Sequence, residues 1–376
     1  MTVVVRVAAP GDGQVLASVL AAAGTRLTGM SSLVPDPALI SARVERSVAS
    51  MSKPVSTPGP EEYLFVAEAC DLAAGPGAAA GPLGDGDVLG MSGIIAGVGL
   101  TETFYSYRVG LVVKSSRELD VYTQVPTIYL NSDLTGSSEL CSLYVAPHGR
   151  ASGMGRLLSS ARLLFIAEHR ERFAERTIAE MRGLVSADGT SPFWQGLGRH
   201  FFSMEFADAD GIYARGNRTF LAELMPAQPI YLPLLPAETQ AAVGQVHERT
   251  APARAMLEAQ GMRHEGYIDI FDGGPTIAAP TDDLYTVANS RRLRVRVADE
   301  VEGGEPWLVS SASLADFRCV LVPALVTDEV TVSAATAKAL RIDQASMVRV
   351  APGRPLQVVQ RSDRLGHEVI VDDSAN

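Results

Sequence analysis

A glycine-containing loop between an apolar strand and a long helix restricts the fold of this chain more than any other segment. The strand-like run Leu140–Val145 leads into Arg150-Ala-Ser-Gly153-Met-Gly155, and an amphipathic stretch follows directly. Its apolar residues have the i, i+1, i+4, i+7, i+8 spacing of one helical face, and they are Leu157, Leu158, Ala161, Leu164 and Phe165. The segment therefore predicts a strand, a tight loop and a helix that packs on a sheet.

The loop has the form R-x-x-G-x-G, carried by Arg150, Gly153 and Gly155. Glycine lets the backbone approach a ligand closely, and the following helix presents free N–H groups and the positive end of its dipole. Both properties suit a pyrophosphate. The pattern is neither the G-x-x-x-x-G-K-[ST] of a P-loop nor the G-x-G-x-x-G of a dinucleotide-binding unit. The plain alternative is a strand-to-helix turn that binds nothing.

Composition and charge limit the class of protein. The chain has 376 residues, of which 47% are hydrophobic and 20% charged, enough for a buried core and for two domains or slightly more. No apolar stretch reaches the roughly 20 residues that a membrane span needs. The net charge of −11 argues against a nucleic-acid partner and is compatible with a cationic substrate. Three scattered cysteines form no metal-ligand spacing and no disulfide framework, which favours a cytoplasmic protein without a metal site.

The order of elements predicts an α+β protein of two units, residues 1–215 and 216–376, with a β-rich C-terminal region. Expected strands of the first unit lie at 2–7, 63–69, 88–98, 108–114, 127–130, 139–145 and 177–181. Expected elements of the second are helices at 236–245 and 251–260 and strands at 267–271, 291–297, 317–322 and 347–350. The Gly-, Ala- and Pro-rich run 72–87 is expected to be a flexible insertion, and the last dozen residues to be frayed.

A weak internal repeat links the two units. A helix-like run that ends at Gly198 precedes an apolar run at 202–206, and a second helix-like run that ends at Gly261 precedes the apolar run 267–271. Each copy reads as a helix that ends in glycine and then a strand. The repeat favours a duplicated fold, and a chance match is the alternative.

At this point the chain resembles a known family. The strand, R-x-x-G-x-G loop and helix resemble the pyrophosphate loop of GCN5-related N-acyltransferases, which bind acyl-CoA. Further blocks resemble arginine N-succinyltransferases and run in order across residues 1–290. These blocks are Tyr105–Gly110, Ser115–Leu119, Ser137–Leu143, Ala179–Gly183, Ser191–Trp194, Ala222–Pro226, Gly244–His247 and Tyr267–Pro275.

The resemblance implies a fold, a reaction and two site residues. The fold would be a tandem of acyltransferase-like domains, with mixed, mostly antiparallel sheets flanked by helices. The reaction would transfer a succinyl group from succinyl-CoA, a co-substrate and not a bound cofactor, to the α-amine of L-arginine in arginine catabolism. His247 corresponds to the family's proton donor, and Leu143 to a residue that binds succinyl-CoA. Some relatives accept ornithine, and some work as paired α and β subunits.

Other candidate roles follow from residue chemistry. Backbone N–H groups of Leu140–Val145 are expected to stabilise the thioester oxyanion in a direct transfer without an acyl-enzyme. Glu139 would position arginine or steer the deprotonation of its amine, or would pair with an arginine of the chain. Arg108 would bind the succinyl carboxylate, since a guanidinium suits that group, or would form a structural ion pair. Cys141 is expected to be a small buried hydrophobic residue and not the nucleophile.

Several alternatives stay open from the sequence. His247 could instead be a solvated helix cap, and Leu143 a core residue. The acceptor could be ornithine or another basic amino acid. The chain could be a homo-oligomer, or a weakly active subunit that needs a homologous partner. The segment Ala146–Gly149 also lacks the acidic residue expected before the loop in this family.

Overall fold

The central layer of the molecule is built by the N-terminal strands. The computed structural model describes residues 2–70, 88–215, 224–226 and 228–353. Strands β1, β2, β3 and β6 are antiparallel neighbours in that order. Their bounds are Thr2–Val7, Glu62–Cys70, Val88–Ile95 and Ser138–Val145.

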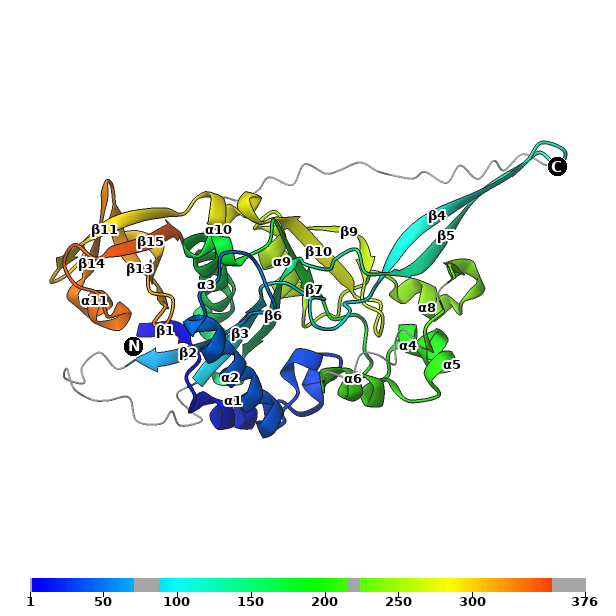
Figure 1. The fold of residues 1–376 in the computed structure, drawn as a ribbon, viewed down its shortest axis with the longest axis horizontal. Coiled ribbons are helices and arrows are strands. Elements are labelled where there is room, and N and C mark those ends of the chain that lie inside the picture. The colour runs from blue at the N-terminus through cyan, green and yellow to red at the C-terminus, as the bar shows by residue number, and fades with distance from the viewer. Residues whose placement is uncertain (1, 71–87, 216–223, 227, 354–376) are drawn as a thin grey trace.

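Helices cover both faces of this layer because its strands are apolar on both sides. Helices α1 (Asp12–Ala21) and α2 (Pro37–Ser52) cover one face, and α3 (Met154–Glu168) covers the other (Figure 1). Leu64 belongs to the apolar cluster under α1 and α2, whereas its neighbour Phe65 packs with Phe165 of α3. This alternation is the period of two of a strand.

The sheet continues past β6 into the second half of the molecule. Strand β7 (Arg176–Glu180) runs parallel to β6, and β10 (Pro275–Pro280), β9 (Arg263–Ile268) and β4 (Ser106–Ser116) follow as antiparallel neighbours. β4 forms a long hairpin with β5 (Val121–Asn131), which pairs with the short β8 (Ile230–Tyr231). The hairpin projects from one end of the elongated molecule (Figure 1).

Short helices pack against this second half around an aromatic cluster that includes Trp194, Phe206 and Phe271. They are α4 (Pro192–Gly196), α5 (Gly198–Phe202), α6 (Phe206–Ala214) and α8 (Ala237–Ala242). Helix α9 (Ala251–Glu258) lies near α3, and α10 (Tyr285–Ala288) packs on α3. Single 3₁₀ turns are η1 (Gly24–Leu27), η2 (Ser31–Leu33), η3 (Pro147–Ser152), η4 (Arg170–Arg172), η5 (Leu232–Leu234) and η6 (Thr281–Asp283).

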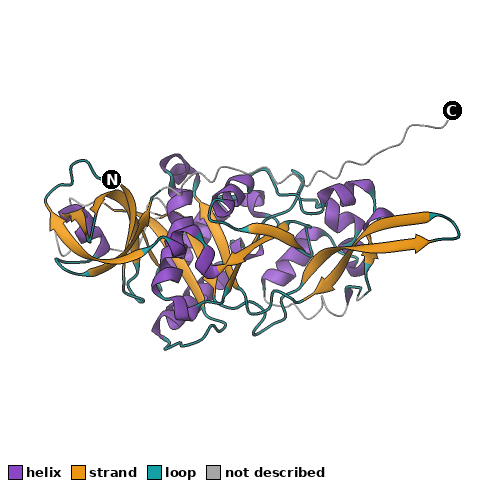
Figure 2. Ribbon diagram, turned by 90° about the horizontal axis from the view of Figure 1, so that it is seen from above, coloured by secondary structure: helices purple, strands orange, loops and turns teal. Residues whose placement is uncertain are grey.

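The C-terminal strands close on themselves. In the sequence of pairings β12–β15–β11–β14–β13, the first and last strands also pair, so five strands form a small barrel with its own apolar cluster. Their bounds are Arg291–Ala298 (β11), Glu305–Ser311 (β12), Arg318–Val326 (β13), Glu329–Ser333 (β14) and Met347–Pro352 (β15), with α11 at Ala334–Leu340. The barrel lies at the end opposite the β4–β5 hairpin (Figure 2) and joins the main sheet where β13 pairs with β1.

Most predicted elements are confirmed, including the strand, loop and helix around residues 140–168 and the β-rich C-terminal region. Mixed helix and sheet with mostly antiparallel pairing is confirmed too, because only β6–β7 and β11–β14 are parallel among the described pairs. The sheet itself crosses residue 215, since β9 pairs with β4, and a domain boundary there stays a prediction. The predicted insertion 72–87 and the C-terminal dozen lie outside the described residues.

Two predicted strands are wrong. Residues 202–206 contain the end of α5 and the start of α6, because Trp194 stacks on Phe202 and contacts Phe206 from a compact helical cluster. The strand expected at 267–271 ends at Ile268, because the Asp269 carboxylate accepts the N–H groups of Phe271 and Asp272 and closes a turn. The first copy of the internal repeat therefore contains no strand.

Candidate active site

A cavity opens where two parallel strands diverge. β6 and β7 pair only at Ser138 with Thr177 and at Glu139 with Ile178. Beyond these pairs, a cavity of about 580 Å³ is lined by β6 residues 139–145 on one side and by residues 180–182 on the other. The loop before α2, helix α6, the turn after β9 and helix α9 supply the remaining walls. The splayed strands thus expose backbone and side chains of the sheet interior to a ligand.

A β-bulge shapes the floor of this cavity. Gly93 of β3 pairs with Cys141 and Met91 pairs with Tyr144, so β6 carries one residue more than β3 over this stretch. Ser142 has a φ of 55°, the left-handed conformation of such an irregularity. A bulge leaves its extra residue out of the ladder. The backbone of Ser142 and Leu143 is therefore turned out of regular pairing beside the cavity.

Two arginines hold the bulge in place. Arg162 is fully buried in α3, and its guanidinium donates to the Cys141 carbonyl oxygen at 3.2 Å. Arg43 donates to the Ser142 hydroxyl at 3.0 Å. Burial lowers the pKa of Arg162 to about 10 and raises the pKa of Cys141 to about 12. Cys141 accordingly stays a thiol near neutrality, as its predicted non-nucleophilic role requires.

The glycine loop meets the cavity at the start of α3. Gly153 adopts the left-handed conformation with a φ of 73°, which favours glycine, and it caps the helix. Gly155 lines the cavity, and the first-turn N–H groups of a helix have no partner within the helix. Arg150 lies in η3, and its side chain is outside the part of the chain that the structure describes. The loop and helix start form a surface suited to an anion.

His247 lies at the edge of the cavity. Its N–H donates to the carbonyl oxygen of Arg182 at 2.9 Å, and its Nδ1 accepts the N–H of Arg249 at 3.1 Å. Arg182 and Arg249 line the cavity, although His247 itself is not among the lining residues. Partial burial and the charges of Arg182 and Arg249 lower the pKa of His247. The ring is therefore neutral at pH 7, with its hydrogen on Nε2.

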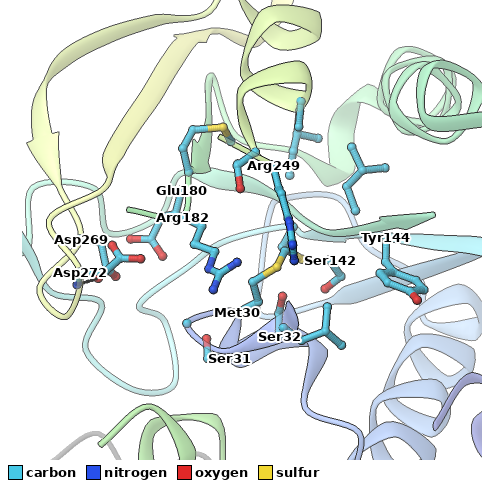
Figure 3. Close-up of a pocket in the computed structure, with 18 of the residues that line it drawn as sticks. Met30, Ser31, Ser32, Ser142, Tyr144, Glu180, Arg182, Arg249, Asp269 and Asp272 are labelled. Atoms are coloured by element: carbon cyan, nitrogen blue, oxygen red, sulfur yellow. Dashed lines mark hydrogen bonds between the residues drawn. The ribbon is translucent and has the colours of Figure 1, made fainter. Parts of the chain in front are cut away.

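The opposite wall of the cavity is acidic. Glu180, Asp269 and Asp272 lie together on one side of Arg182 in Figure 3. The Asp272 carboxylate accepts the N–H groups of Gly183 at 2.6 Å and Gly274 at 2.9 Å. Burial raises the pKa of Asp269, and burial together with the Asp269 charge raises the pKa of Asp272 well above its ordinary value. A cation at this wall would compensate carboxylates that the fold keeps away from water.

Asp210 of α6 adds a further carboxyl group to the cavity. Its Oδ2 accepts the N–H of Gly29 at 3.1 Å. Burial raises the pKa of Asp210 to about 7. The carboxyl is thus poised to change its charge near neutral pH.

The structure brings some of the predicted site residues together and separates others. Glu139, Leu143 and Gly155 line the cavity, with His247 at its edge. Arg108 is not among the lining residues. Its guanidinium donates to the Tyr267 hydroxyl and lies 3.9 Å from the Asp133 carboxylate, so it takes part in a structural ion pair.

The charged lining residues that sequence reasoning missed include Arg182, Arg249, Asp269 and Asp272. All but Arg249 lie within blocks that carried the family resemblance, and Arg249 lies two positions after His247. A charged side chain in such a block, next to a strand end, was the available signal. Within the described residues, no group of three or more His, Cys, Asp or Glu side chains is arranged to hold a metal ion.

Comparison with known proteins gives one consistent result. The model of the family "Arginine N-succinyltransferase beta subunit" matches residues 3–286, and that of its C-terminal domain matches residues 291–352. An arginine N-succinyltransferase of Yersinia enterocolitica is 40% identical over 345 residues, covering 91% of this chain and 96% of the relative. An arginine N-succinyltransferase subunit beta of Pseudomonas aeruginosa is 44% identical over 295 residues, covering 78% and 83%.

A solved structure agrees with these relatives. The arginine/ornithine succinyltransferase subunit AI of Pseudomonas aeruginosa superposes with a TM-score of 0.82 at 34% identity, covering 94% of this chain and 99% of that one. The likeness therefore extends over the central sheet, the cavity and the C-terminal barrel together.

Proposed function

This chain belongs to the arginine N-succinyltransferase family, and we propose that it transfers the succinyl group of succinyl-CoA to the α-amine of L-arginine. The observation that carries this proposal is the cavity between β6 and β7. It combines a bulged strand, a glycine loop at a helix N-terminus and an acidic wall, with His247 at its edge. These parts match the four needs of the reaction: an oxyanion partner, a pyrophosphate site, a site for a cationic acceptor and a donor to the leaving sulfur.

The donor would enter along β6 and α3. Gly155 and the N-terminal N–H groups of α3 suit the pyrophosphate of coenzyme A. The pantetheine arm of coenzyme A would follow the edge of β6 at Leu143. There it would contact the backbone of Leu143 and not its side chain. Pro252 and Met256 of α9 supply an apolar wall opposite Gly155. This arrangement directs the thioester towards the bulge at Ser142.

The acceptor would enter from the acidic wall. The guanidinium of arginine is cationic, and Asp269 and Asp272 present carboxyl groups whose pKa values burial has raised. A bound cation lowers those pKa values and is attracted in return. With the guanidinium there, the α-amine of the substrate lies nearer β6. Glu139 at the start of the β6 cavity wall would accept the amine proton directly or through water.

Transfer would be direct. The amine nitrogen attacks the thioester carbon, and the N–H groups of the bulge stabilise the oxygen as it gains charge. The C–S bond then breaks as the amide forms. The nitrogen loses one proton and the coenzyme A sulfur gains one, so the exchange is balanced. We propose His247 as the donor to sulfur in its imidazolium form, which gives up the Nε2 proton and returns to the neutral ring. To reach that form, Nδ1 takes up a proton and releases the Arg249 N–H that it accepts in this structure.

The tandem architecture is part of the same proposal. Residues 1–215 would form the acyl-CoA-binding unit, which the order β6, α3, β7 supports, and residues 216–376 a second acyltransferase-like unit with the C-terminal barrel. Amide hydrogen exchange tests this division. If the chain has two such units, the amides before and after residue 215 should exchange as two separate cooperative groups. A single cooperative group that extends to the barrel near residue 291 would refute this division.

Steady-state release of coenzyme A tests the activity. Purified protein is assayed with succinyl-CoA or acetyl-CoA against arginine, ornithine or lysine. Release that requires both succinyl-CoA and arginine is expected. Because the similar Pseudomonas aeruginosa subunit is named an arginine/ornithine succinyltransferase, ornithine is the second acceptor to compare. No release with any pair, despite tight binding of succinyl-CoA, would favour a subunit that depends on a partner chain.

We also propose that two copies of this chain associate through the β4–β5 hairpin. Large apolar side chains are exposed on it, with Leu119 75% and Tyr122 67% exposed, joined by Leu111, Val113 and Val121. The hairpin stretch 111–122 contains two cationic and two anionic side chains and so has no net charge, whereas the whole chain has a net charge of −11. Electrostatic repulsion between two copies of the chain is therefore weak at this stretch. An exposed apolar patch of this kind marks an interface.

Sedimentation of the Leu119→Ser/Tyr122→Ser double variant tests the association. Loss of self-association is expected, with Leu325→Ser on the distant barrel as the control, since Leu325 is also exposed. A monomeric parent chain would refute the proposal.

None of the described helices is long and apolar enough to cross a membrane. We propose a cytoplasmic location, where the three free cysteines would stay reduced.

A further inference from the structure

We propose that the distal carboxylate of the succinyl donor is bound between the guanidinium groups of Arg249 and Arg182, and that this pair selects a dicarboxylic acyl group. The inference rests on the proposed succinyl transfer and deepens it, because it assigns the donor selectivity to two residues. Both side chains line the cavity, and both point into its middle in Figure 3.

Backbone hydrogen bonds fix the two arginines around His247. Arg182 follows the end of β7, and its carbonyl oxygen accepts the N–H of His247 at 2.9 Å. Arg249 donates its own N–H to Nδ1 of the same ring at 3.1 Å. Because His247 faces the leaving sulfur in the proposed reaction, its two arginine neighbours lie beside the acyl group. The pair is therefore positioned by the same elements that position the chemistry.

Electrostatics favour an anion beside Arg249. Arg249 is exposed to the cavity, and no ion pair joins it to a carboxylate of the described residues. Arg182 is 8% exposed; burial lowers its pKa, the carboxylates of Asp272 and Asp210 raise it, and the positive charge of Arg249 lowers it. A carboxylate that bridges the two guanidinium groups forms charge-assisted contacts with both and reduces their mutual repulsion.

The layout of charge decides which carboxylate fits. Glu180, Asp269 and Asp272 lie on the far side of Arg182, away from Ser142, in Figure 3. The carboxyl groups on that side disfavour an anion there and favour the cationic guanidinium of the acceptor. The succinyl carboxylate is separated from the thioester carbonyl by two methylene groups. Figure 3 places Ser142 on the side of Arg182 that faces away from the three carboxyl groups. A succinyl thioester held at the Ser142 bulge therefore has its distal carboxylate on that side, near Arg249 and Arg182.

Butyryl-CoA is the matched probe, since it replaces the distal carboxylate of succinyl-CoA by a methyl group. The values of kcat/KM for succinyl-CoA and butyryl-CoA are measured with arginine for the parent chain and for Arg249→Met and Arg182→Met. We expect the succinyl-to-butyryl ratio to fall on the order of 10- to 100-fold in each variant. Arg254→Met on α9 is the control, because Arg254 pairs with Glu258 and does not line the cavity. Its ratio should equal that of the parent.

Different failures are distinguishable. If kcat/KM falls by the same factor for succinyl-CoA and for butyryl-CoA in Arg249→Met, the succinyl-to-butyryl ratio is unchanged and the carboxylate assignment is overturned. A parent chain that transfers neither acyl group overturns the proposed function itself. Agmatine, which is arginine without its carboxylate, provides a further arm. If the variants lose the arginine-to-agmatine preference in place of the donor preference, the pair binds the acceptor's carboxylate and the inference is wrong. Arg249 is exposed, so its variant tests the proposal even if Arg182→Met fails to fold.

Discussion

The Nδ1 atom of His247 accepts the backbone N–H of Arg249 at 3.1 Å. A backbone N–H cannot change its role, so this contact fixes the tautomer of the ring. The neutral ring carries its hydrogen on Nε2, and a second proton could reach Nδ1 only if the contact broke. The same peptide segment that places Arg249 in the cavity thus determines which atom His247 presents to a ligand.

Replacement of His247 by alanine should reduce kcat for coenzyme A release by about 10²- to 10⁴-fold, the usual range for a lost proton-transfer group. The Kd for succinyl-CoA should stay near that of the parent, because the proposed donor site is built by β6 and α3. Stopped-assay rates and calorimetric binding measure the two quantities. His200→Ala, on the exposed surface of α5, is the control. A fully active His247→Ala protein would remove the residue from the mechanism.

The imidazole of His247 should titrate below its ordinary pKa of 6.5, because partial burial and the positive charges of Arg182 and Arg249 disfavour the charged ring. NMR titration of the ring protons measures this. In Arg249→Met one positive charge is gone and the backbone N–H remains, so the pKa of His247 should rise. An unchanged pKa in that variant would show that the Arg249 guanidinium lies too far from the ring to act on it.

A methyl group at Gly155 should raise the KM for succinyl-CoA. A Cβ there would meet only Met256 and Val145, each at 3.7 Å, so the folded chain has room for alanine. The same Cβ would occupy space beside the glycine loop that the proposed coenzyme A site needs, and an increase of about tenfold corresponds to about 1.4 kcal/mol of crowding. Gly11→Ala, whose Cβ would meet nothing within 4 Å, is the control. Equal KM values in both variants would place the donor elsewhere.

Asp210→Asn should stabilise the free protein above neutral pH and leave its stability unchanged near pH 4. The folded pKa of Asp210 is raised to about 7 by burial, above the unfolded value of about 3.9. Folding therefore favours the protonated form, and the parent loses stability as pH rises between these values, by at most about 1.4 kcal/mol per pH unit. Denaturant unfolding at pH 4, 6 and 8 measures the difference. Asp208→Asn, exposed on the same helix, should show no such trend.

Local patterns predicted the elements around the cavity. The strand Leu140–Val145 and the helix after Gly155 were predicted with nearly correct bounds. A strand and an amphipathic helix each space their apolar residues with a characteristic period, which can be recognised within a short segment. Glu139, Leu143 and Gly155 all line the cavity, and their roles in the reaction stay predictions. Where aromatic packing overrode the pattern, as at Phe202 and Phe206, the predicted strand was wrong.

Contacts between distant segments could not be predicted in the same way. Arg108 was expected to bind the donor, but its cross-strand neighbour is Tyr267 of β9, where the guanidinium stacks 4.7 Å from the ring centroid. That pairing depends on a strand more than a hundred residues later. Arg182 and Asp272 likewise give no periodic signal. They come together only in the folded chain, where the Gly183 N–H donates to the Asp272 carboxylate.

The sequence by itself determined the strand, the glycine loop and the helix, and its blocks identified the family. Those features depend on neighbouring residues and on backbone preferences that a short segment carries. Only the tertiary structure decided that β6 and β7 diverge beyond Glu139 and Ile178 and that a bulge turns Ser142 out of the ladder. It also decided that the backbones of Arg182 and Arg249 both hydrogen-bond to His247. Strand register and long-range charge placement decide these points, because each requires segments from different parts of the chain to be packed together before the cavity exists.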